Sequence, residues 1–153
     1  MGFVLARCER PANEHYPESA QNNKRFIEEP VKIMSPITHN ILRAIDYKAV
    51  GKKRQENFEH LAHELDEINE IIPRSTFGAF MYPLLIENGP ELRRELQGQK
   101  IYVSMLWGRD PQPTGLSGRL AKDILPIVCD QRYGADEMNV EIEAIKALLN
   151  RQA

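Results

Sequence analysis

Two histidines are the first residues whose spacing could support chemistry. His60 and His63 lie three positions apart, with Glu56, Glu59 and Glu64 close by in the sequence. Residues three apart share a face of an α-helix, so both imidazoles could bind one metal ion. The alternative is a solvated helix face of mixed charge, and we assign no metal ligands on this pattern.

Cys129 is the candidate nucleophile, next to Asp130 and near Arg132. A nearby cation lowers the pKa of a thiol and a nearby carboxylate raises it. Because no histidine lies close enough in the sequence to act as its base, we predict a buried structural cysteine. Cys8 is far away, and neither cysteine has metal-ligand spacing. Both are therefore expected to be reduced thiols in the cytoplasm.

Arg132 and Trp107 are the candidate substrate-binding residues. Arg132 lies in a polar turn, Asp130–Gly134, between a predicted strand and a predicted helix. Its planar guanidinium could bind a carboxylate or a phosphate through two parallel hydrogen bonds. The alternative is an ion pair with Asp130 or Asp136. Trp107 precedes a glycine-containing loop, where it could form the wall of a ligand site or pack in the core.

The composition limits the class of protein. The chain has 153 residues, 42% hydrophobic and 27% charged, which suits one domain with a packed core, or a domain and an arm. A net charge of −2 argues against a protein that holds nucleic acid by its phosphates. No apolar run approaches the roughly 20 residues of a membrane helix. We therefore expect a cytoplasmic protein with neither nucleic acid nor membrane as its partner.

Residues 1–35 differ from the rest of the chain. Gly2–Ala6 predicts a strand, whereas Arg7–Asn23 holds two prolines, three asparagines and few aliphatic residues. Such a long unpatterned stretch indicates a disordered leader, or an arm that packs against something outside this chain. A brief helical turn is expected over Lys24–Glu29. We place a domain boundary after residue 35.

A long helix is predicted to begin at Ser35, a capping residue followed by Pro36 at the first helical position. Asp46 is expected to interrupt and recap this helix, and Pro73 to end it. Its apolar positions share one face: Ile37, Ile41, Leu42, Ile45, Val50, Phe58, Leu61, Leu65 and Ile68.

Strands and shorter helices follow. The expected strands are Thr76–Ile86, Lys100–Trp107 and Ile124–Val128, and the expected helices are Glu91–Gln97, ended by Gly98, and a last helix opened by Asp136 and Glu137. Pro126 should place its strand at a sheet edge. Residues 36–153 are thus predicted to form a two-layer α/β (α+β) domain. Its small sheet, antiparallel or mixed and of about three strands, is covered by helices.

Three groups of residues within 35–150 resemble a known family, the DegT-type sugar aminotransferases that depend on pyridoxal phosphate (PLP). One group resembles the interdomain helix of that family: Ile41-Leu42, Asp46-Tyr47, Arg54-Gln55-Glu56-Asn57-Phe58, Leu61 and Leu65. Tyr82-Pro83-Leu84, a helix and Lys100-Ile101-Tyr102 resemble the first half of the small domain. Ile124-Leu125-Pro126-Ile127 and Asp130-Gln131-Arg132-Tyr133 resemble its last strand and helix start.

The resemblance implies the C-terminal small domain of a fold-type I aminotransferase, which closes over a large domain that carries PLP and the catalytic lysine. No lysine here matches the family's lysine context, and Gly2–Ala6 looks like the strand just after it. Residues 1–35 would then be a remnant of large-domain sequence. Amino-group transfer to a keto sugar or a similar substrate, and PLP binding, are not expected of this chain alone.

Whether the chain is itself an enzyme stays open. The alternative to a separated small domain is a freestanding, non-catalytic module that binds a protein or a ligand. In either case we expect self-association through the apolar face that an absent large domain would leave uncovered.

Overall fold

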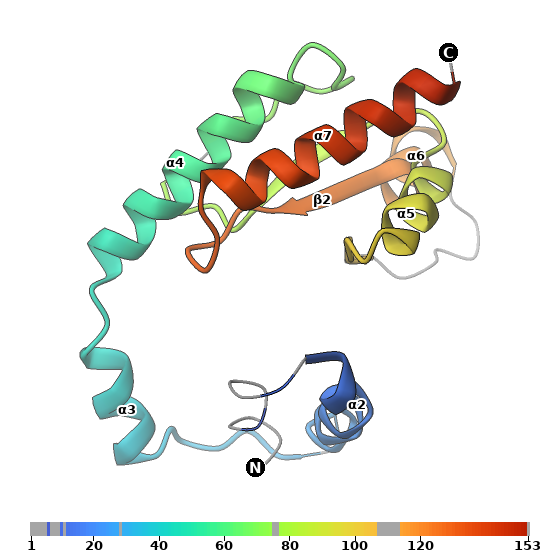
Figure 1. Ribbon diagram of the computed structural model, residues 1–153. Helices are drawn as coiled ribbons and strands as arrows, with labels where there is room; N and C mark the ends of the chain where they lie inside the picture. The colour runs from blue at the N-terminus through green and yellow to red at the C-terminus, as the bar shows by residue number, and fades with distance from the viewer. Residues whose placement is uncertain are drawn as a thin grey trace. The chain divides into compact units, whose positions relative to one another are not determined.

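The computed structural model describes Ala6, Arg10 and residues 12–27, 29–74, 77–106 and 114–152. The chain divides into two compact units, Met1–Ile45 and Asp46–Ala153, ten residues beyond the boundary expected after residue 35. The elements in chain order (Figure 1) are the 3-10 helix η1 (Ala12–His15), α2 (Tyr16–Arg25), α3 (Pro36–Arg43), α4 (Tyr47–Leu65), β1 (Met81–Leu85), α5 (Gly89–Gly98), α6 (Gly115–Asp123), β2 (Ile124–Val128) and α7 (Ala135–Gln152).

The first unit is more helical than the sequence predicted. Helix α2 forms within the stretch expected to lack regular structure, and Pro17 fits its first turn, where no backbone donor is needed. Helix α3 begins as predicted, because the Ser35 hydroxyl accepts a hydrogen bond from the Thr38 backbone at 3.2 Å. The strand expected over Gly2–Ala6 lies outside the described residues except for Ala6, which is helical.

The predicted long helix is interrupted at Asp46, as expected. The Asp46 carboxylate accepts hydrogen bonds from the backbones of Lys48 and Ala49, both at 3.0 Å, and so caps α4. The end of α4 was predicted wrongly, since the helix stops at Leu65 rather than near Pro73. The residues after Leu65 instead turn towards β1 and bond to its edge.

Strands β1 and β2 form an antiparallel pair in which Pro83 faces Pro126. Cys129 N donates to Phe80 O at 3.1 Å, which makes these two residues a hydrogen-bonded pair. Because such pairs alternate along an antiparallel ladder, Pro83 and Pro126 occupy positions whose amide groups would point away from the partner strand. The missing donor of each proline therefore costs no ladder bond, and both strands are edges, as Pro126 predicts.

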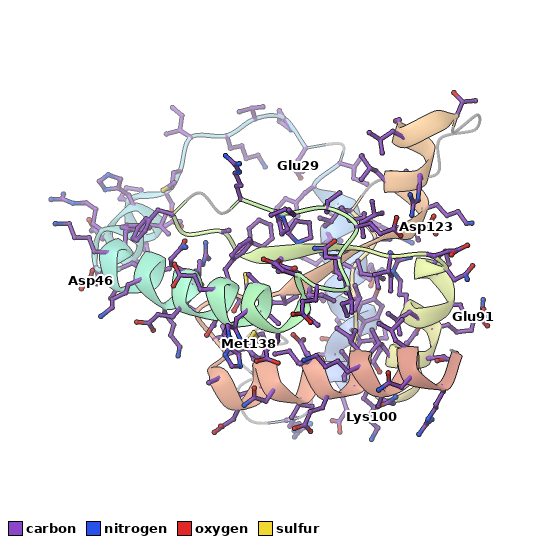
Figure 2. The ribbon with its side chains drawn as sticks, turned by 90° about the horizontal axis from the view of Figure 1, so that it is seen from above. Glu29, Asp46, Glu91, Lys100, Asp123 and Met138 are labelled. Carbon is purple, nitrogen blue, oxygen red and sulfur yellow. The ribbon has the colours of Figure 1, made fainter. Side chains whose placement is uncertain are left out.

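Helices cover one face of this sheet and enclose the core (Figure 1). Helices α4 and α7 lie side by side and run in the same direction, because bonded partners advance together along both: Asn57 with the turn before α7, His60 with Asn139, and Glu64 with Lys146. In Figure 2, Met138 lies at the beginning of α7, on the side towards α4. The most deeply buried side chains are Leu61, Leu65, Tyr82, Leu84, Leu96, Leu125, Cys129, Met138 and Ile145.

The third predicted strand is absent from the described residues, because Lys100–Leu106 makes no ladder. The free edge of β1 is closed: Asn69 donates to Pro83 O and accepts from Leu85 N, both at 2.9 Å, and Glu70 N donates to Leu85 O. On the free edge of β2, proline supplies no donor at the middle of the strand. Neither edge is therefore well suited to another strand.

The first predicted strand was also too long. It begins at Met81, because Phe77 and Gly78 form a turn in which Gly78 has a φ of +85°. The fold class is confirmed, since the chain is a mixed α/β protein with a small antiparallel sheet covered by helices. Among the described helices, none has the length and apolar composition of a membrane span.

Candidate functional site

The turn between β2 and α7 gathers the polar side chains singled out in the sequence. Asn57 of α4 holds this turn, because its side-chain nitrogen lies 3.4 Å from Cys129 O, 3.0 Å from Asp130 O and 3.0 Å from Tyr133 O. Asn57 is 2% exposed, so these bonds are shielded from water. One buried amide thus fixes the course of the backbone that presents Arg132.

Arg132 pairs with Asp130, which is one of the two alternatives that the sequence left open. The guanidinium Nη2 donates to Asp130 Oδ2 at 2.6 Å, and Nε lies 3.0 Å from both carboxylate oxygens. The Arg132 backbone also donates to Oδ1 at 2.9 Å. Burial opposes ionisation of Asp130, but the hydrogen bonds from Arg132 outweigh it and hold the carboxyl pKa below its ordinary value.

The Arg132 side chain nevertheless remains 63% exposed, with its guanidinium 5.3 Å from the centre of the Tyr133 ring. The same hydrogen bond to Asp130 raises the pKa of the guanidinium. Arg132 is therefore a fixed positive charge on a rigid turn. Its predicted contact with a substrate carboxylate or phosphate stays a prediction.

A second arginine joins the turn to the loop before β1. Arg54 donates to Gln131 Oε1 at 2.7 Å and to Gly78 O at 3.3 Å. In the same loop, the Phe77 ring lies against Gly51 of α4, where a Cβ would come within 2.2 Å of the ring. The first turns of α4, the Phe77–Gly78 loop and the β2–α7 turn therefore form one polar and aromatic cluster.

Cys129 is buried and structural, as predicted. The side chain is 0% exposed, and burial, with Asp130 as a secondary cause, raises the pKa of its thiol to about 12. A thiol that stays protonated is a poor nucleophile. Its Sγ instead lies 3.5 Å from Ala79 O.

The two histidines do not share a ligand. His60 Nε2 lies 2.7 Å from Asn139 Oδ1, whereas His63 Nδ1 lies 2.9 Å from the carboxylate of Glu64. Glu64 in turn accepts a hydrogen bond from Lys146 at 2.7 Å. In the part of the chain that the structure describes, no three histidine, cysteine or acidic side chains are grouped to bind a metal. The solvated face of mixed charge is the arrangement found.

The sheet face opposite the helices carries a hollow of about 380 Å³. Its lining is apolar and includes Phe77, Phe80, Leu106, Ile124 and Pro126. PLP needs a lysine for its aldehyde, an acid for its pyridine nitrogen and donors for its phosphate. The lining offers none of these side chains, so the hollow does not fit PLP.

Trp107, the second candidate substrate residue, lies outside the described residues. Sequence reasoning missed the bridging role of Asn57 and the buried carboxyl of Glu141. Glu141 follows Met138 by three and precedes Ile145 by four, which is the spacing of the buried face of α7. Its Oε2 is buried without a hydrogen-bond partner, and burial, aided by Asp130, raises the pKa of the carboxyl to about 7.

Comparison with known proteins does not add a family to this geometry. No protein-family model matches the chain, and no curated protein matches it either.

Proposed function

We propose that this chain contains the small domain of a PLP-dependent aminotransferase-like protein of the DegT type. In the complete protein, the domain would close over a PLP-bearing large domain during amino-group transfer to a keto sugar or a similar carbonyl compound. The residues present here would not bind PLP covalently or catalyse transfer alone. We also propose that the protein resides in the cytoplasm, where its buried thiol stays reduced.

The observation that carries the proposal is the convergence of the three resemblance motifs. Asn57, from the interdomain-helix motif, donates to the backbone carbonyls of Asp130 and Tyr133, from the last motif. Its neighbour Phe58 packs edge-to-face on Tyr82, from the middle motif, with ring centres 5.3 Å apart. The three motifs therefore lie in one packed unit, which is the arrangement that the resemblance implies.

The apolar hollow supports the proposal from the opposite side of the sheet. A domain that closes over a partner domain needs one face of its sheet for its own helices and the other face for the partner. The hollow lies on the second face, and Phe77 and Phe80 at its border are 69% and 51% exposed. Exposed aromatic side chains beside an apolar hollow are typical of a surface that is covered in the working protein.

The same hollow favours the second candidate function, a non-catalytic module that binds an apolar ligand or a protein. Its volume is within the usual range of small-molecule sites, about 300–1,000 Å³. In either case we expect the chain to associate with a second copy of itself through this face. Size-exclusion chromatography over a range of protein concentrations tests it. We expect an apparent mass that grows with concentration, and a strict monomer that binds no hydrophobic dye would argue against an uncovered face.

Reductive trapping with PLP tests the proposal directly. The chain is incubated with PLP, reduced with borohydride and mapped by mass spectrometry. We expect scattered, substoichiometric labelling of exposed lysines such as Lys48 and Lys52, because no lysine lines the apolar hollow. A stoichiometric adduct on one lysine would show a complete cofactor site within these residues and would refute the claim of inactivity.

A further inference from the structure

One partly buried carboxyl group, that of Glu141, has no role in the turn or in the proposed function. Glu141 lies on the face of α7 whose neighbours Met138, Ile142 and Ile145 are 1%, 4% and 1% exposed. Its Oε2 atom is buried and has no hydrogen-bond partner. Burying an unpaired carboxylate is costly, so such a group stays neutral until the pH is high enough to ionise it.

Three basic side chains of the neighbouring α4 have other partners. Arg54 bonds to Gln131 and to Gly78 O, and His60 lies against Asn139. The charge of Lys53 attracts the carboxylate of Glu137, and Lys146 of α7 donates a hydrogen bond to Glu64.

In the part of the chain that the structure describes, the other elements that pack on α7 offer no counter-charge either. Asp130 is the acid that acts electrostatically on Glu141. It is ionised and bonded to Arg132, and its charge opposes a negative charge on Glu141. Strand β1 has no charged residue. On α5, Arg93 bonds to Ile124 O, Arg94 pairs with Glu91, and Glu95 is exposed.

We propose that Glu141 makes the packing of α7 on α4 pH-sensitive. Below neutral pH the carboxyl is protonated and α7 is held firmly. As the pH rises through neutrality the carboxyl ionises beside Asp130, and the first half of α7 loosens together with the turn that carries Arg132. This inference goes beyond the proposed function and holds whether or not the chain belongs to an aminotransferase.

The sign of the effect follows from linkage. The unfolded carboxyl ionises near pH 4.5 and the folded one near pH 7, so the folded state binds more protons between these values. The contribution of Glu141 to stability is complete below about pH 4.5 and is lost as the pH rises through about 7. Asp130, with its lowered pKa, titrates at more acidic pH, and Cys129 titrates near pH 12, so neither masks this window.

Urea unfolding of the full chain from pH 5 to pH 8.5 tests the inference. For the wild type we expect the unfolding equilibrium constant to rise between pH 5 and pH 8 by roughly tenfold to a hundredfold. Glu141→Gln keeps the shape of the side chain and removes its charge, so this rise should disappear. Glu143→Gln changes an exposed carboxylate on the same helix and should keep the wild-type profile.

A carbon-13 NMR titration of the glutamate carboxyls in the wild type provides a readout that needs no variant. We expect one glutamate with a midpoint near neutral pH, assigned to Glu141 by its absence in Glu141→Gln. Hydrogen exchange should also show the amides of α7 losing protection over the same pH range while those of α5 keep theirs. Parallel urea profiles for wild type and Glu141→Gln, or glutamates that all titrate near pH 4.5, would overturn the inference.

Discussion

At the scale of single residues, two buried side-chain amides form hydrogen bonds with backbone groups of the β2–α7 turn and of the free edge of β1. Asn69 satisfies a donor and an acceptor on the free edge of β1, where another strand would otherwise pair. It also donates to the Tyr82 hydroxyl, which donates to Asp66 at 2.7 Å. Asn57 plays the same part for the β2–α7 turn. Both amides are buried, so their bonds are difficult to replace with water.

Replacing Asn57 tests the residue that joins the motifs. Asn57→Ala should lower the free energy of unfolding by about 2 to 3 kcal/mol, because buried carbonyls of the turn lose their donor. Urea denaturation measures the change. Asn150→Ala, at an exposed position of α7, is the matched control and should stay within about 0.5 kcal/mol of wild type. Equal effects of the two substitutions would show that the turn does not depend on Asn57.

Residue roles of this kind were only partly predictable. The sequence showed that Arg132 could pair with Asp130, and it indicated a buried Cys129, because both depend on near neighbours. The partners of Asn57 lie more than 70 residues away, so no local pattern names them. Glu141 could have been found, because a charge at the spacing of a buried face is visible in the sequence.

At the scale of elements, prolines and helical spacing predicted most of the second unit. Pro90 lies in the first turn of α5, Leu92 and Leu96 are buried as expected, and β2 has the predicted bounds. The errors arose where tertiary contacts decide whether a segment forms a strand or a helix. Lys100–Ser104 alternates exposed and partly buried residues as a strand would, yet Lys100–Leu106 forms no ladder with the neighbouring edges.

The junction of α5 and α6 provides a test at this scale. Gly89 begins α5, and a Cβ there would lie 2.2 Å from the carbonyl oxygen of Asp123. Figure 2 shows Asp123 and Glu91 at the same end of the unit. Gly89→Ala should therefore force a backbone shift and destabilise the protein by about 1 to 3 kcal/mol.

Gly98, the last residue of α5, is the matched control for this substitution. A Cβ at Gly98 meets no atom within 4 Å, so Gly98→Ala should leave stability unchanged or raise it by up to about 1 kcal/mol. Thermal melts of the two variants measure the difference. A Gly89→Ala melting temperature at or above that of Gly98→Ala would contradict the close contact.

At the scale of the whole molecule, the core formed by the described residues lies in the second unit. Every residue of the buried cluster falls between Phe58 and Leu148. The first unit instead exposes apolar side chains along one segment: Phe26, Ile27, Val31, Ile33, Met34, Ile37 and Ile41. Composition alone could not reveal this difference, because both units contain enough aliphatic residues for a core.

A chain that begins at Asp46 should therefore fold without the first unit. We expect a cooperative thermal transition within about 5 °C of that of the full chain, because the buried cluster lies within the retained residues. Circular dichroism at 222 nm follows the transition. A shortened chain that melts without cooperativity would show that residues before Asp46 complete the fold.

The central claim is that Asp46–Ala153 is the small domain of a PLP-dependent enzyme. The DNA upstream of the Met1 codon tests this claim most directly. Our account predicts a coding sequence for a large domain, in the same or a shifted frame, that ends in a lysine-bearing cofactor motif shortly before Gly2–Ala6. An upstream region that encodes no such domain in any frame would contradict it.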